Sequence, residues 1–182
     1  MENSLEDEML KHLPSLRAFA LSLTRDRTQA DDLVQDTILR AWGNRDQFKI
    51  GSNMRAWMFT ILRNSFYTTR RRLKREVADV DGEIAAQLSV KPDHDGHIAL
   101  EEFKDAFAQL RDEQREALLL VGVSGFSVEE AAEMCGCAPG TIKSRASRGR
   151  KKLAALLQLD DGEMPMMTDA ATLGVVLSAP AV

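Results

Sequence analysis

The chain contains 182 residues with a net charge of −4, and only 5% of its residues are aromatic. This length supports one good core or two small ones, and the scarcity of aromatic residues favours an all-α fold of two small helical domains. The net charge does not exclude a nucleic-acid partner, because Arg40 to Arg75 holds ten basic residues and a single acid, Asp46.

Two cysteines close together in the sequence cannot build a disulfide framework, so we expect reduced thiols and a cytoplasmic protein. The amino terminus, MENSLEDEML, lacks the basic and apolar regions of a signal peptide, and no apolar run reaches the length of a membrane span. We therefore expect no contact with a membrane.

Two helices are predicted before residue 43. Leu5 to Leu23 has one apolar stripe, in which Pro14 is placed to kink or restart the helix. After a polar break, Gln29 to Trp42 has an apolar face and a polar face. The polar face carries Asp32, Gln35, Asp36 and Arg40. Taken alone, this polar stripe also fits an ordinary solvated helix face.

A loop is predicted over Gly43 to Asn53, followed by a helix from Met54 to Arg75. The inward face of this helix is expected to comprise Met54, Trp57, Met58, Ile61, Leu62 and Ser65. Its outward face is expected to carry Arg55, Phe59, Arg63, Phe66 and Arg70. Rings interleaved with arginines are typical of a platform for single-stranded nucleic acid, because bases stack on rings. The competing interpretation is that Phe59 and Phe66 pack under another helix.

Val77 to His97 loses helical periodicity and gains Asp, Gly and Pro, which predicts a flexible acidic linker. Periodicity resumes at Ile98 and begins a second bundle. The expected segments are a first domain at 1–76, a linker at 77–99, a second domain at 100–158 and a C-terminal tail at 159–182.

A helix-turn-helix is predicted from Ser127 to Leu157. Ser127 and Glu130 have the spacing of a capping box at the start of its first helix. The chain then turns at Gly136, and Pro139 suits the opening turn of the second helix. This second helix is dense in basic residues, so we expect it to contact DNA.

On the second helix, Ile142, Ala146 and Leu153 are expected to pack on the first helix, which leaves the polar side chains for DNA. The candidates for contacts to base edges are Lys143, Ser144, Ser147 and Arg148. The other DNA-binding candidates, mainly for phosphates, are Thr141, Arg145, Arg150, Lys151 and Lys152. A merely solvated basic helix is the competing interpretation, but it leaves the turn and the cap unexplained.

Catalytic and metal chemistry finds little support in the sequence. Asp93 to His97 lacks the alternating oxygen ligands of a calcium loop, and Cys135 and Cys137 do not have the spacing of a zinc site. We find no catalytic triad, Cys–His pair or phosphate-binding loop. We therefore expect no metal, no cofactor and no enzymatic activity.

Three sequence blocks follow one another: DDLVQDTILRAW, RAWMFTILRNSFYTTRRR and GTIKSRASRGRKKL. In this order and separation they resemble bacterial RNA polymerase sigma factors of the extracytoplasmic-function group, over roughly Leu5 to Leu157. The overall similarity is greatest to the general-stress-response type. This resemblance implies a transcription initiation factor whose two domains correspond to sigma regions 2 and 4.

The resemblance also implies roles for residues of region 2. The helix matching Asp31 to Trp42 is expected to bind the clamp helices of the largest subunit of core RNA polymerase, through Asp32, Gln35, Asp36 and Arg40. The segment Asp46 to Arg75 is expected to recognise the minus-ten element, with a base of the non-template single strand flipped into a pocket. The expected pocket residues are Asn64, Lys49, Ser52 and Asn53, supported by Trp57. The DNA backbone is expected to be held by Arg63, Arg70, Arg71 and Arg72.

For region 4, the resemblance places the helix from Thr141 to Leu153 in the major groove of the minus-thirty-five element. Members of the general-stress type are held by a small helical anti-sigma factor, NepR-like, that bridges both domains. A phosphorylated response regulator with a sigma-like domain captures that protein and releases the sigma factor. We expect the same regulation here.

Two other functions remain open at this point. A conventional one-site repressor or activator uses only the helix-turn-helix and leaves the block from Asp31 to Arg72 unexplained. A sigma-like mimic that sequesters an anti-sigma factor needs the arginines of neither block. Such a mimic usually carries an attached receiver domain, which we do not expect here.

Overall fold

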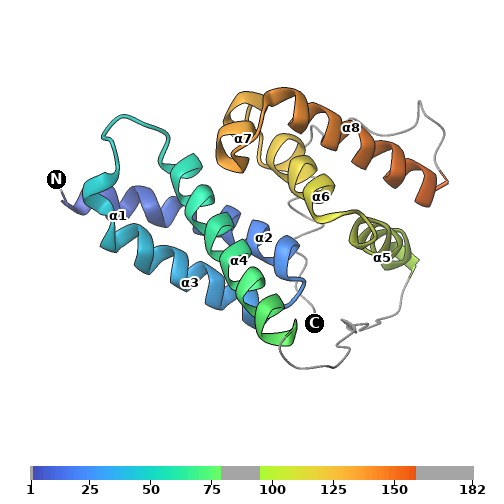
Figure 1. Cartoon of the computed structure of the whole chain (residues 1–182), viewed down its shortest axis with the longest axis horizontal. Coiled ribbons are helices and arrows are strands. Elements are labelled where there is room, and N and C mark those ends of the chain that lie inside the picture. Colours follow the sequence, from blue (N-terminus) through green and yellow to red (C-terminus); the bar gives the residue numbers. More distant parts are fainter. Residues whose placement is uncertain (1, 79–94, 159–182) are drawn as a thin grey trace.

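The computed structural model describes residues 2–78 and 95–158, which form two helical bundles packed against each other (Figure 1). The first bundle contains α1 (Glu2–Lys11), α2 (Leu13–Thr24), α3 (Arg27–Gly43), the short 3-10 turn η1 (Arg45–Gln47) and α4 (Met54–Ala78). The second contains α5 (Asp95–Ala108), α6 (Asp112–Leu118), the π-helical turn η2 (Leu119–Val123), α7 (Val128–Cys135) and α8 (Pro139–Leu156). All regular structure in these two described ranges is helical, so the all-α prediction is confirmed.

The ends of the predicted linker are helical. α4 continues to Ala78 and α5 begins at Asp95, three residues before the predicted restart at Ile98. The rest of the predicted linker, residues 79–94, and the predicted tail at 159–182 lie outside the described residues.

A proline divides the first predicted helix into two. α1 ends at Lys11, and α2 begins at Leu13 with Pro14 in its first turn, where a missing N–H costs no helical hydrogen bond. Asp26 then caps α3 by accepting a hydrogen bond from the Gln29 N–H at 2.8 Å. The polar break predicted between the two sequence patterns is therefore the turn between α2 and α3.

Apolar side chains of α4 fill the core of the first bundle. Met54, Met58 and Leu62 are at most 1% exposed, as their helical spacing predicts. Trp57 is half-buried and packs on Phe48, with the two ring centroids 5.1 Å apart. This ring pair anchors the connection between α3 and α4 to the bundle.

The second bundle packs α8 closely on α6. Ile142, Ala146 and Leu153 are buried, as predicted. Gly149 faces α6 so closely that an added Cβ would lie 3.0 Å from Cδ1 of Leu118. A larger residue at this position would therefore require the facing α6 side chains to shift.

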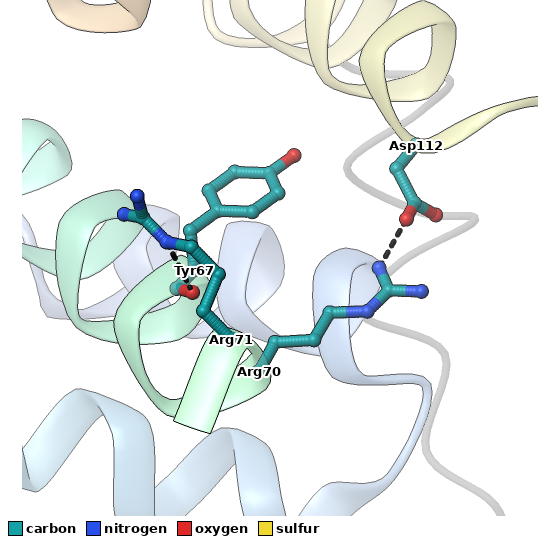
Figure 2. Close-up of a pocket in the computed structure, with 4 residues that line it drawn as sticks. All are labelled: Tyr67, Arg70, Arg71 and Asp112. Carbon is teal, nitrogen blue, oxygen red and sulfur yellow. Dashed lines mark hydrogen bonds and ion pairs between the residues drawn. The ribbon is translucent and has the colours of Figure 1, made fainter. Parts of the chain in front are cut away.

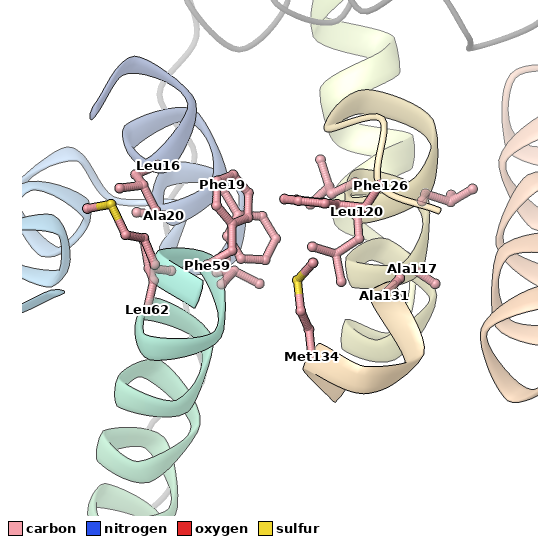
Figure 3. Packing of buried hydrophobic residues seen from close by; sticks show 14 of the residues in the cluster. Leu16, Phe19, Ala20, Phe59, Leu62, Ala117, Leu120, Phe126, Ala131 and Met134 are labelled. Atoms are coloured by element: carbon pink, nitrogen blue, oxygen red, sulfur yellow. The ribbon is translucent and has the colours of Figure 1, made fainter. Parts of the chain in front are cut away.

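Aromatic packing joins the two bundles (Figure 3). Phe59 of α4 stacks on Phe19 of α2 with ring centroids 4.9 Å apart, and it meets Phe126 edge-on at 5.0 Å. Phe126 precedes α7, and the guanidinium carbon of Arg55 lies 4.6 Å from the centroid of its ring. One apolar cluster therefore runs from the core of the first bundle into the second.

Candidate nucleic-acid interface

The helix-turn-helix formed by α7 and α8 has the cap, turn and helix start that the sequence predicts. Ser127 Oγ accepts a hydrogen bond from the Glu130 N–H at 3.1 Å, and Glu130 Oε2 accepts one from the Ser127 N–H at 2.8 Å. Gly136 ends α7 with a φ of 63°, a left-handed conformation that favours glycine. Pro139 lies in the first turn of α8. The predicted cap, turn and helix start are all confirmed.

The side of α8 that faces away from α6 presents the predicted DNA contacts. The exposed candidates are Lys143, Ser147, Arg148, Arg150 and Lys151, and the half-buried ones are Thr141, Ser144 and Arg145. Arg148 donates through Nη2 to Ser144 Oγ at 3.0 Å and through Nε to the Ser144 carbonyl at 3.2 Å. These bonds orient its guanidinium along the helix. Lys152 is also exposed and donates to the Gln109 carbonyl at 2.6 Å.

Helix α3 presents a mixed polar and apolar surface. Of the predicted polymerase contacts, Asp32, Gln35 and Arg40 are exposed, and Asp36 is half-buried. Asp36 accepts a hydrogen bond from Nε of Arg40 at 2.7 Å. Leu39 and Trp42, at helical steps from Gln35, are 71% and 36% exposed. Charged groups beside exposed apolar ones are typical of a protein-binding surface.

An open pocket of about 300 Å³ lies between α3, η1 and α4. Its lining residues are Arg40, Asn44, Gln47, Ile61, Asn64, Ser65 and Thr68. Asn64 is exposed on α4 and contributes its amide to this pocket. Lys49, Ser52 and Asn53 are exposed in the loop before α4 but do not line it, so this arrangement does not bring the four predicted pocket residues together.

A buried ion pair connects α4 to the second bundle. Nε of Arg63 donates to Oε1 of Glu116 on α6 at 2.6 Å, and the Glu116 side chain is only 1% exposed. Burial by itself lowers the pKa of Arg63, but the charge and hydrogen bonds of Glu116 outweigh it and raise the pKa overall. Arg63 is therefore fully charged and neutralises a carboxylate that has lost its water.

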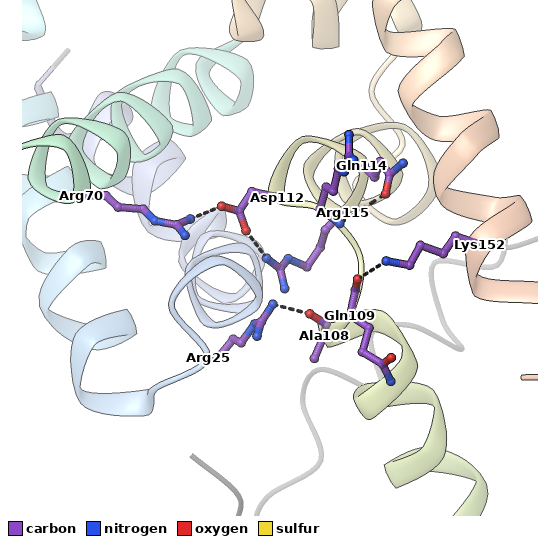
Figure 4. A network of polar contacts seen from close by, with 9 residues as sticks. Arg25, Arg70, Ala108, Gln109, Asp112, Gln114, Arg115 and Lys152 are labelled. Carbon is purple, nitrogen blue, oxygen red and sulfur yellow. Dashed lines mark hydrogen bonds and ion pairs between the residues drawn. The ribbon is translucent and has the colours of Figure 1, made fainter. Parts of the chain in front are cut away.

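A second set of polar contacts lies further along α4 (Figure 4). Arg70 pairs with Asp112, and Asp112 also accepts a hydrogen bond from Nη2 of Arg115 at 2.5 Å. Arg25, at the end of α2, donates to the Ala108 carbonyl at the end of α5 at 2.5 Å. These contacts hold the start of α6 and the end of α5 against the first bundle.

The contact between α4 and α6 is open to solvent at one edge (Figure 2). A pocket of about 200 Å³ there is lined by Tyr67, Arg70, Arg71 and Asp112. Nε of Arg71 donates to the carbonyl of Tyr67, one turn earlier on the same helix, at 3.2 Å. Arg71 and Arg72 are both exposed at this end of α4. The arginine cluster is thus partly engaged with α6 and partly accessible.

Asn53 links the loop before α4 to α7. Its Nδ2 donates to Oε1 of Glu130 at 2.9 Å, while its Oδ1 accepts a hydrogen bond from the Ala56 N–H at 3.1 Å. The backbone N–H of Ser127 lowers the pKa of Glu130, and the Asn53 amide lowers it further. The predicted minus-ten residue Asn53 therefore already contacts the other bundle.

The predicted exposure of Phe59 is wrong. Its side chain is 0% exposed between Phe19 and Phe126, so in this arrangement its ring cannot stack on a base. Phe66 is also half-buried against the core. The face of α4 that points outward from the first bundle points inward at the second, and the spacing of one helix cannot reveal this. The competing interpretation, packing under another element, is correct for Phe59.

Sequence reasoning missed Glu116 and Phe126, which complete the contact between the bundles. Glu116 stands three and four residues before Leu119 and Leu120, which are both buried. A charged residue at an apolar position of a helix is a signal that it has a buried partner. Phe126 offers no comparable signal, because it lies in a short connection.

The described residues place no group of three His, Cys, Asp or Glu side chains where they can hold a metal ion. Cys135 and Cys137 are free thiols, and burial raises the pKa of Cys135 to about 12. Asp93 and His94 lie outside the described residues. Within the described ranges, every helix is too short or too polar to cross a membrane.

Two protein-family models match the chain. Sigma-70 region 2 matches residues 9–76, and Sigma-70, region 4 matches residues 100–153. The chain is also 54% identical to the ECF RNA polymerase sigma factor EcfG of Rhodopseudomonas palustris, over 90% of each protein. The chain belongs to the extracytoplasmic-function sigma factors. The chain is also 31% identical to RNA polymerase sigma factor CarQ of Myxococcus xanthus, over 86% of this chain and 90% of CarQ.

Two solved structures have the same fold. The sigma factor RpoE of Bartonella quintana, solved in complex with the anti-sigma factor NepR, is 50% identical with a TM-score of 0.78. The match covers 86% of this chain and 98% of RpoE. CnrH, solved in complex with the cytosolic domain of CnrY, is 26% identical with a TM-score of 0.59, over 87% of this chain and 90% of CnrH.

These matches assign the two bundles. The first bundle, α1 to α4, is sigma region 2, and the second, α5 to α8, is sigma region 4. As a sigma factor, the chain directs promoter-specific initiation by binding core RNA polymerase and promoter DNA. A one-site repressor or activator does not account for the region 2 match.

Proposed function

We propose that this sigma factor selects promoters by reading two DNA elements in two physical forms. Region 4 reads the minus-thirty-five element as a duplex through α8, and region 2 reads the minus-ten element as a single strand through the loop before α4 and α4 itself. The observation that carries the proposal is the exposed, acid-free basic face of α8, paired with a separate arginine-rich helix in the other domain. We further propose a cytoplasmic, non-enzymatic role.

On α8, four residues at helical spacing are the proposed base readers. Lys143, Ser144, Ser147 and Arg148 contact base edges in the major groove, where Arg and Lys hydrogen-bond to guanine. Thr141, Arg145, Arg150 and Lys151 hold the adjacent phosphates and fix the helix in the groove. The bonds of Arg148 to Ser144 support this role, because they restrict the guanidinium before DNA arrives.

In region 2, we propose that Asn64 hydrogen-bonds a flipped base of the non-template strand. Its exposed amide lies in the pocket between α3, η1 and α4. Lys49, Ser52 and Asn53 approach the same strand from the loop, while Arg63, Arg70, Arg71 and Arg72 hold its phosphates. Extruding a base costs a few kcal/mol of stacking, which these contacts offset.

This assignment requires region 4 to move away from α4 before the strand binds. Arg63 is paired with Glu116, Arg70 with Asp112 and Asn53 with Glu130. We propose that polymerase binding drives the separation, with α3 docking through Asp32, Gln35, Asp36 and Arg40 onto the clamp helices. Promoter phosphates then replace the carboxylates of Glu116 and Asp112 as the partners of Arg63 and Arg70.

We also propose regulation by a small helical anti-sigma factor during a stress response. The 50% identity to the sigma factor solved with NepR supports this partner. Such a protein stabilises the packed state of the two regions and thereby keeps the α4 contacts occupied. Adding a NepR-like protein from the same genome to the transcription assay is expected to suppress initiation, and unchanged initiation would contradict this regulation.

The central test is transcription reconstituted from core RNA polymerase, the wild-type chain and a library of promoters. We expect selective initiation, and Asn64→Ala is expected to lower opening and minus-ten preference by about tenfold, the loss of one or two good base contacts. Gln29→Ala, an exposed amide on α3, is the matched control for loss of a surface amide. If wild type fails to initiate, the function is wrong; if Asn64→Ala equals the control, only the pocket assignment is wrong.

A further inference from the structure

The loop before α4 presents an isoleucine to solvent. Ile50 is 89% exposed, more than the other exposed large apolar side chains of the described residues, Leu39, Leu10, Leu73 and Trp42. Single exposed apolar residues are common on protein surfaces and need no explanation by themselves. The position of Ile50 is distinctive because Lys49, Ser52 and Asn53, three proposed contacts to the single strand, surround it in the sequence.

A tight turn holds Ile50 at its corner. The Ser52 N–H donates to the Lys49 carbonyl at 2.9 Å, and Ser52 Oγ donates to the same oxygen at 2.7 Å. The turn therefore runs from Lys49 to Ser52, with Ile50 at its second position. Gly51 follows with a φ of 88°, the left-handed value that a type II turn requires at its third position. A glycine is favoured there, and Ile50 projects from the bend.

Both ends of the turn are anchored. On one side, Phe48 is 9% exposed and packs on Trp57. On the other, Asn53 caps α4 through the Ala56 N–H. The turn that carries Ile50 is therefore anchored at both ends. An apolar side chain on an anchored turn loses less conformational entropy on binding than one on a free loop.

We propose that Ile50 is an apolar wedge that packs against unstacked bases at the edge of the melted minus-ten segment. This inference rests on the proposed function of region 2. An isoleucine has no group to hydrogen-bond a base edge, but it can replace the stacking contact that a base loses on extrusion, as apolar wedges do in other DNA-bending proteins. Lys49 and Ser52 then hold the neighbouring backbone. Ile50 acts in opening the duplex, while Asn64 acts in reading the flipped base.

The proposal predicts a template-dependent defect. Open-complex formation is measured with core polymerase on a promoter selected with the wild-type chain, once as duplex and once with a mismatched, pre-melted minus-ten segment. Ile50→Ala is expected to lower open-complex formation about tenfold on duplex, the effect of losing most of one buried isoleucine, and by less than about twofold on the pre-melted template. Ile50→Leu keeps the apolar bulk and is expected to retain most activity.

Leu10→Ala is the matched control, because Leu10 is 57% exposed on α1, on a different element from the minus-ten loop. Wild-type initiation on both templates verifies the proposed function independently of the wedge. If the wild-type chain initiates on both templates but Ile50→Ala forms open complexes on duplex as well as wild type does, the proposal that Ile50 is a wedge is wrong. An equal loss on both templates overturns it too, and indicates that Ile50 contacts the polymerase or the strand after opening.

Discussion

Helices α4 and α8 both carry arginines expected to bind DNA, but two arginines of α4 are paired with carboxylates of the second bundle. On α8, the exposed side includes Lys143, Ser147 and Arg148. On α4, Arg63 and Arg70 are paired with carboxylates of α6. In this arrangement the proposed duplex-binding surface of α8 is open, whereas the proposed strand-binding surface of region 2 is partly engaged by region 4 through Arg63, Arg70 and Asn53.

The difference shows that similar charge patterns have different partners in the folded chain. α8 lies at the edge of region 4, so its basic face meets solvent, whereas α4 lies on the side of region 2 that packs against region 4 (Figure 1). Arg63 and Arg70 of α4 pair with the α6 carboxylates of Glu116 and Asp112, and Phe126 packs on the ring of Phe59.

The largest effect is expected at the buried pair of α4. Arg63→Ala leaves Glu116 buried without its cation and is expected to lower the free energy of unfolding by about 3 kcal/mol, measured by urea denaturation. The matched control is Arg40→Ala, whose partner Asp36 is 44% exposed. The control is expected to lose less than about 0.5 kcal/mol. Equal, small losses would mean that α4 is not covered in solution.

A smaller effect is expected on the open helix. Arg148→Ala is expected to weaken binding of the full chain to minus-thirty-five duplex by about 2 kcal/mol, because one bidentate base contact is lost. The loss is expected to disappear on DNA that already carries the wrong base pair.

Lys151→Ala, which removes a proposed phosphate contact, is expected to weaken binding to all DNA sequences alike and to reduce the salt slope by about 1. Fluorescence anisotropy at several salt concentrations separates the two, and a uniform loss with Arg148→Ala would make it a phosphate contact.

The smallest effect is expected at Glu130 of α7, which contacts Asn53 of the first bundle. Glu130→Gln is expected to lower the free energy of unfolding by less than about 1 kcal/mol near neutral pH, since it removes a negative charge at the start of α7. Folding lowers the pKa of Glu130, so its stabilisation is present above the ordinary glutamate pKa. It is lost as the pH falls through the lowered value.

Denaturation of wild type and Glu130→Gln at several pH values measures this dependence. The difference between the two proteins is expected to shrink on acidification. Glu133→Gln, an exposed acid in the last turn of α7, controls for the loss of a surface charge. A difference that grows in acid would show that the carboxylate is not stabilised by Ser127 and Asn53.

Features decided by neighbouring residues were predictable from the sequence. Ser127, Gly136 and Pro139 act through their own backbone geometry, so the cap, the turn and the helix start could be named without a structure. The buried stripe of Met54, Met58 and Leu62 followed from helical spacing in the same way.

Features decided by contacts between the bundles were not predictable in the same way. Phe59 was assigned to the wrong environment because its neighbours Phe19 and Phe126 lie 40 or more residues away in the chain. Its helical position is compatible both with solvent and with a second domain. The pairing of Arg63 with Glu116 depends on the same docking, which no local pattern encodes.

The close approach of Gly149 to Leu118 affects how α8 is oriented relative to the rest of region 4. Because α8 rests directly on α6 at this point, the tilt of α8 relative to the rest of region 4 depends on a hydrogen atom where every other amino acid has a carbon. An alanine at 149 would require the side chains of Leu118 and Gln114 on α6 to shift by a few tenths of an ångström. The packing at Gly149 therefore helps to set the direction of the basic face of α8, although this glycine lies on the opposite, buried side of the helix.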